Sequence, residues 1–108
     1  MEIDRQDRQG AVVLSLKGEL DFNTAKAFNE TIAKLIEENM QRIVIEMKGL
    51  AHVDSMGLGS ITKLWKIADQ QGFALILADV PKNILNLIKL VNLDRRILIY
   101  DSVEEALV

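Results

Sequence analysis

Residues 43–59, IVIEMKGLAHVDSMGLG, contain the signals that best define how this chain folds. The stretch opens with three adjacent β-branched residues, a short dense apolar run that is typical of a strand covered on both faces. The run ends at Met47, and residues 48–54 break its pattern. We therefore predict a strand over 42–47, then a loop, then a helix over 56–71 that begins just after Ser55.

The residues after Ser55 have the spacing of an amphipathic helix. The apolar side is formed by Leu58, Ile61, Leu64, Trp65 and Ala68, and the polar side by Ser60, Lys63, Lys66, Asp69 and Gln70. We therefore expect Ser60 and Lys63 to face away from the core. Gly72 is suited to end this helix in a left-handed turn.

A hydroxyl at the start of a helix lies at a position that favours a bound anion. The first backbone N–H groups of a helix have no internal partners, and the macrodipole places partial positive charge there. Gly57 and Gly59 fall in the first turn, where each costs about 1 kcal/mol relative to Ala, but a missing Cβ lets another backbone or a ligand come close. The simpler interpretation is that Asp54 or Ser55 serves only as the N-cap of the helix.

Composition excludes several classes of protein. The chain has 108 residues, enough for one domain, with 49% hydrophobic and 27% charged residues. It has no cysteine, which rules out disulfides and thiolate metal sites. Thirteen scattered bases against 16 acids give a net charge of -3, so the basic patch of a nucleic-acid-binding protein is absent.

No targeting or membrane segment is expected. The first ten residues, MEIDRQDRQG, lack the apolar core of an export signal, and no apolar run approaches the ~20 residues that cross a bilayer. We therefore expect a cytoplasmic protein with no membrane insertion.

Strands and helices alternate along the rest of the chain. The other predicted strands are 2–5, 11–17, 73–77 and 97–100. A helix over 24–39 would be capped by Asn23 or Thr24, and a helix over 82–92 would begin after Pro81. A short C-terminal helix would start at the capping box 102–105. This order predicts a single α/β domain over 1–108, with about five strands in a mixed, mainly parallel sheet, four helices and an antiparallel N-terminal hairpin.

Two motifs in this frame resemble those of a known family, the STAS domains, and within it the single-domain anti-sigma factor antagonists. Residues 18–21, GELD, look like the family's motif after the second strand, and residues 53–59, VDSMGLG, look like its phosphorylation-site motif. The resemblance covers nearly the whole chain and includes the order of the elements.

The resemblance implies a binding protein controlled by phosphorylation, with no enzyme activity, cofactor or metal. Its partner would be an anti-sigma factor that is also a serine kinase of the histidine-kinase-like ATPase fold. The unphosphorylated antagonist would bind this partner and free the sigma factor. Phosphorylation at Ser55 would release the partner, and a PP2C-type phosphatase would reset the switch.

The expected docking surface surrounds Ser55. Its residues are Asp21, Asn23, Thr24, Asp54, Met56, Gly57, Gly59, Ser60 and Lys63. A phosphate would add a charge of about -1.5 to -2 beside Asp21 and Asp54, and interfaces penalise uncompensated charge. Asp21 either contributes to recognition or only caps the helix at 24. Met56 departs from the small or hydroxyl-bearing residue common in the family, and could offer an apolar contact or slow phosphorylation.

The sequence supports three other functions less well. A hydrolase would need a glycine two residues before Ser55 and a histidine from a separate element, whereas His52 lies in the same loop and makes no convincing metal site. A small-ligand or nucleotide-binding domain would need a Gly-rich phosphate loop, which is absent. A non-switching STAS subunit, acting as the scaffold of a signalling assembly or as a transporter-associated partner, stays open as the alternative.

Overall fold

A single sheet with the strand order β1-β2-β3-β4-β5 organises the chain, in a computed structural model that describes residues 1–108. The strands are β1 (Glu2–Arg8), β2 (Ala11–Leu20), β3 (Arg42–Val53), β4 (Ala74–Ala78) and β5 (Leu98–Tyr100). The helices are α1 (Ala25–Glu37), α2 (Ser55–Gln71), α3 (Lys82–Leu90) and α4 (Val103–Ala106), with a short 3-10 helix, η1 (Leu93–Arg95).

The pairing of the strands confirms the predicted mixed sheet. β1 and β2 form an antiparallel hairpin in the register Arg8 to Ala11, and the remaining neighbours are parallel. The hairpin turns at Gln9 and Gly10, whose φ angles are 51° and 78°. Two consecutive residues of positive φ form the type of turn whose twist matches that of the flanking strands.

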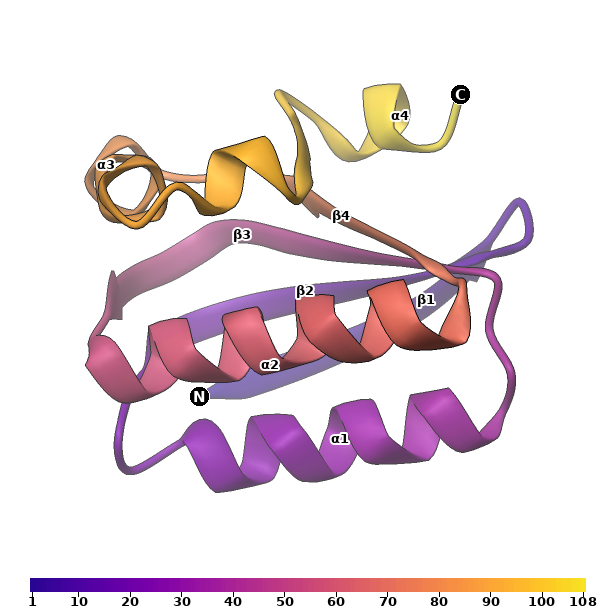
Figure 1. Ribbon diagram of the computed structural model, residues 1–108, viewed down its shortest axis with the longest axis horizontal. Helices are drawn as coiled ribbons and strands as arrows, with labels where there is room; N and C mark the ends of the chain where they lie inside the picture. The colour runs from indigo at the N-terminus through magenta and orange to yellow at the C-terminus, as the bar shows by residue number, and fades with distance from the viewer.

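The helices cover the sheet unequally because each parallel connection moves one strand in the same direction. Right-handed crossovers then place α1, α2 and α3 on one face. Figure 1 shows α1 and α2 side by side along the sheet, with α3 seen end-on and α4 separate from them. α4 covers the other face, where Ala106 and Leu107 are buried against β3 and β4.

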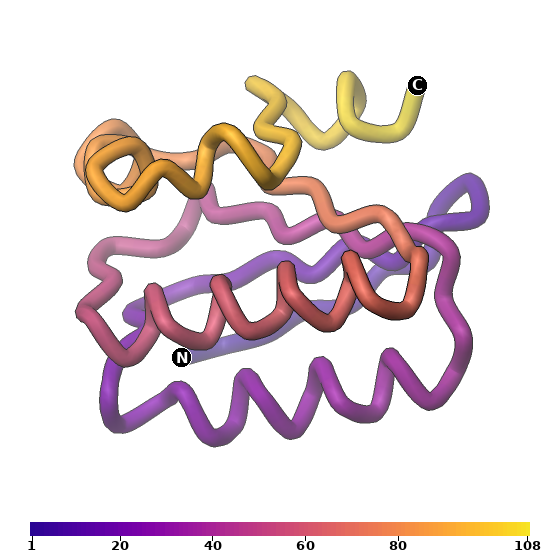
Figure 2. Tube along the Cα trace, in the orientation of Figure 1, coloured from indigo at the N-terminus to yellow at the C-terminus, as the bar shows by residue number.

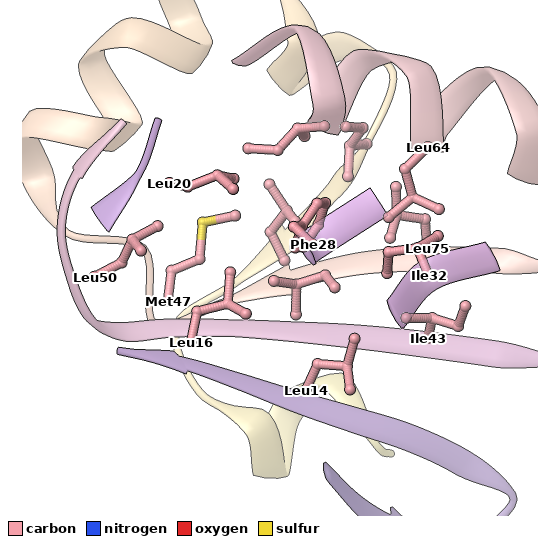
Figure 3. Close-up of a cluster of buried hydrophobic side chains, with 14 of the residues drawn as sticks. Leu14, Leu16, Leu20, Phe28, Ile32, Ile43, Met47, Leu50, Leu64 and Leu75 are labelled. Atoms are coloured by element: carbon pink, nitrogen blue, oxygen red, sulfur yellow. The ribbon is translucent and has the colours of Figure 1, made fainter. Parts of the chain in front are cut away.

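The larger cluster of buried side chains lies under α1, α2 and α3. Phe28 of α1 is fully buried in it (Figure 3). Figure 3 also shows Leu20, Met47 and Leu50 grouped at one end of the cluster. The core therefore extends to the edge of the sheet at which β2 and β3 end.

β2 and β3 are longer than predicted. We expected them to end at Lys17 and Met47, but they continue side by side to the pair formed by Leu20 and Val53. The register shifts twice between these strands, so the regular alternation of buried and exposed residues that marks a strand in sequence is lost there. Gly49 lies so close to β2 that a Cβ would stand 3.0 Å from the Leu16 carbonyl oxygen.

Of the later helices, α2 ends where the sequence predicts and α3 ends earlier. α2 ends as expected at Gly72, where φ is 79° and the N–H donates to the Ala68 carbonyl oxygen. α3 stops at Leu90 because the chain turns through Asn92, whose φ is 61°, into the unpredicted η1. Among the apolar residues of α3, Ile84 and Ile88 are buried, and Leu90 is exposed.

Candidate functional site

Two short segments meet at the carboxyl ends of β2 and β3, residues 21–24 and 54–59. They leave from paired positions, because Leu20 and Val53 are neighbours in the sheet. Figure 2 shows the chain entering α1 and α2 at the same end of the molecule, opposite to the hairpin turn of β1 and β2. The two motifs singled out in the sequence therefore form one site.

The Asp54 carboxylate joins the two segments. Its Oδ1 accepts a hydrogen bond of 2.9 Å from the Gly57 N–H, and its Oδ2 accepts one of 3.0 Å from the Phe22 N–H. Asp54 is thus the N-cap of α2, which decides between the two capping candidates, and Ser55 is the first residue of the helix.

Gly57 fits against the backbone of β2. A Cβ built on Gly57 would stand 2.1 Å from the Leu20 carbonyl oxygen, which also accepts a 3.3 Å hydrogen bond from the Asp54 N–H. A Cβ on Gly59 would meet nothing within 4 Å. The close approach expected from the two glycines is therefore confirmed for Gly57, where the neighbour is backbone of the same chain.

Asp21 organises the turn that enters α1. Its Oδ1 accepts hydrogen bonds from the Asn23 N–H at 2.9 Å and the Thr24 N–H at 3.2 Å. Thr24 Oγ1 accepts from the Asp21 N–H at 2.9 Å and donates to the Glu19 carbonyl oxygen at 2.8 Å. The predicted capping by Asn23 or Thr24 is wrong, because neither side chain caps the helix and Asp21 binds the N–H groups that precede it.

The surface around Ser55 is partly apolar. Ser55 itself is exposed, and the next side chain, Met56, is 51% exposed. Phe22 is 73% exposed, although the bond from its N–H to Asp54 fixes its backbone beside the start of α2. Sequence reasoning did not single out Phe22, and its only signal is a large aromatic residue directly after GELD.

Two residues predicted for the docking surface face the interior. Ser60 is only 7% exposed and lies with Phe28 at a hollow of about 100 Å³ between α1 and α2. Gly57 is buried against Leu20. Their predicted place on the surface is therefore wrong, whereas Gly59 and Lys63 are exposed. Gly57 and Ser60 are one turn apart on the side of α2 that packs, and a small residue at each lets the helix approach its neighbours.

Hydrogen bonding sets the charge of Asp54. The bond from the Gly57 N–H, helped by that from Phe22, holds the pKa of the Asp54 carboxyl below its usual range. Both carboxylate oxygens accept from backbone N–H groups, and no hydrogen bond from His52 reaches Asp54, so Asp54 does not orient this histidine as a hydrolase would require.

Changing Asp54 to Asn should lower the thermal midpoint at neutral pH, because one of the two N–H groups would face an amide NH₂. A lowered folded-state pKa stabilises the fold above the unfolded pKa of about 4, and this stabilisation is lost as pH falls through the folded pKa. The difference in midpoint between wild type and Asp54→Asn should therefore shrink below about pH 4. Thermal melts of both proteins across this range measure it, and a difference that stays constant with pH would contradict the assignment.

Two further features, a metal-binding group of side chains and a membrane-spanning helix, are absent from the structure. No three His, Cys, Asp or Glu side chains are grouped so that they could hold a metal ion. A bilayer-spanning helix is also absent, since none is both long and apolar enough.

Comparison with protein families and curated proteins gives consistent results. The family model described as "STAS domain" matches residues 2–106. An anti-sigma F factor antagonist of Paenibacillus polymyxa is 29% identical over 108 residues, which cover 99% of this chain and 92% of the relative.

Solved structures share the fold at lower identity. A crystal structure of an anti-sigma factor antagonist from Mycobacterium paratuberculosis superposes with a TM-score of 0.85 at 23% identity, covering 98% of this chain and 90% of that one. The Bacillus cell fate determinant SpoIIAA in its phosphorylated form superposes with a TM-score of 0.77 at 20% identity, covering 97% and 96%.

Proposed function

The chain belongs to the STAS domain family, and from this we propose that it is an anti-sigma factor antagonist whose binding is controlled by phosphorylation of Ser55. Unphosphorylated, it binds an anti-sigma factor and so releases a sigma factor. The match to the Paenibacillus antagonist along almost its whole length supports the binding function.

The proposed phosphorylation switch is based on the position of Ser55, which is exposed and is the first residue of α2. A hydroxyl there is open to a kinase, and the helix N-terminus favours the phosphate that results. The fold does not depend on Ser55, since the neighbouring Asp54 provides the cap. A phosphorylated form of SpoIIAA, which has the same fold, is consistent with a domain that stays folded when it carries phosphate.

The chemistry of the switch defines its partners. The anti-sigma factor itself transfers the γ-phosphoryl group of ATP to the Ser55 hydroxyl, as a serine kinase of the histidine-kinase-like ATPase fold, and a PP2C-type phosphatase removes it by hydrolysis. The antagonist contributes the acceptor and no catalytic group. All these proteins act in the cytoplasm, where the sigma factor is used.

Incubating the purified chain with ATP, Mg²⁺ and the anti-sigma factor kinase encoded in the same genome should add one phosphate, on Ser55. Phosphopeptide mass spectrometry locates it, and the Ser55→Ala variant should stay unmodified. Modification at another residue, or none, would count against the switch. Tight binding without any modification would favour the non-switching scaffold instead.

A further inference from the structure

Two large apolar side chains near the start of α2 are exposed to solvent. Phe22 and Met56 are 73% and 51% exposed. They reach the site from different segments, Phe22 from the turn before α1 and Met56 from the first turn of α2. The Phe22 N–H bonds to Asp54, the residue before Ser55, and Met56 is the residue after Ser55.

The backbone that carries Phe22 is held on both sides. Asp21 donates its N–H to Thr24 Oγ1, Phe22 to Asp54, and Asn23 to Asp21 Oδ1, at distances of 2.9 to 3.0 Å. The backbone of such a fixed turn loses little conformational entropy when a partner buries the side chain that it carries. Rigid aromatic residues that fill a pocket are the commonest energetic anchors of protein interfaces.

The charges next to these side chains indicate which partner surface fits. Asp21 and Asp54 lie beside Phe22, and the lowered pKa of Asp54 keeps its carboxylate ionised at neutral pH. An apolar centre with an acidic border is complementary to an apolar pocket with a basic border.

We propose that Phe22 and Met56 are the paired apolar anchors by which this chain docks into a pocket with a basic border on its anti-sigma factor. This inference rests on the proposed function, since it names the contact made by that site. A phosphate on Ser55, the residue that precedes Met56, would add a dianion next to this contact, and docking would have to remove water from it.

The test is the affinity of Phe22→Ala for the anti-sigma factor kinase used in the phosphorylation assay, measured by calorimetry with ADP present. Affinity should fall about tenfold or more, and less for Met56→Ala. Phe22→Trp, which keeps an aromatic ring, should bind more tightly than Phe22→Gln, which keeps a long but polar side chain. Thermal midpoints of all variants should stay near wild type, because both side chains are exposed.

Leu90→Ala is the matched control, because Leu90 is another exposed large apolar residue, at 78%, on α3. It should bind within about twofold of wild type. Wild-type affinity in Phe22→Ala, or an equal loss in Leu90→Ala, would overturn the anchor proposal and leave the proposed function standing. Failure of the unmodified wild type to bind would overturn both.

Discussion

Replacing Ser55 with Asp should weaken binding to the anti-sigma factor by about 2–5 kcal/mol, which is roughly thirtyfold to several thousandfold in affinity. The new carboxylate would be enclosed by the partner beside Asp54, the N-cap of α2. The free domain should keep its stability, because the helix N-terminus favours a negative charge and offsets the repulsion from Asp54.

Ser55→Asn provides the matched control, since Asn has nearly the shape of Asp and no charge. It should bind far more tightly than Ser55→Asp, and Ser55→Ala should bind like the unphosphorylated wild type. Calorimetric titration of the three variants against the same partner separates charge from size. If Asp and Asn weaken binding equally, shape and not charge controls release, and the electrostatic explanation of the switch fails.

Replacing Gly57 with Ala should destabilise the fold by about 3 kcal/mol or more, a large share of the stability of a domain this size. The new methyl group would stand 2.1 Å from the Leu20 carbonyl oxygen, where backbone and not a mobile side chain must give way. A helix would otherwise prefer Ala to Gly, so local propensity predicts the opposite sign.

Gly59→Ala is the natural comparison, two residues later in the same helix. A Cβ there meets nothing within 4 Å, so the substitution should stabilise the domain by up to ~1 kcal/mol. Urea unfolding of both variants measures the two effects. Similar changes in both would mean that the close contact at Gly57 has no energetic weight.

The parts of the fold that local pattern defines were predicted from the sequence. The order of the elements, the N-terminal hairpin and the end of α2 at Gly72 depend on residues close in the chain, whose spacing and backbone preferences can be read directly. The position of Ser55 at the start of a helix followed from the same signals.

Features that depend on contacts between distant segments were missed. β3 continues to Val53 because β2 pairs with it through two register shifts, which no alternation of residues announces. Ser60 was assigned to the polar side of α2 from helical spacing, but it lies three residues after Gly57 and four before Leu64, which are both buried. The place of Phe22 beside α2 depends on the bond from its N–H to Asp54, which only the tertiary structure brings about.

The Asp54 carboxylate accepts hydrogen bonds from both Gly57 and Phe22, and this shared acceptor limits how the binding specificity of the protein could be redesigned. A chimera that received the 21–24 loop of a paralogue without the matching 54–59 loop would combine two halves of different origin around one shared acceptor. Rewiring such a signalling circuit to a new anti-sigma factor would therefore require both loops to be transplanted together from the same donor.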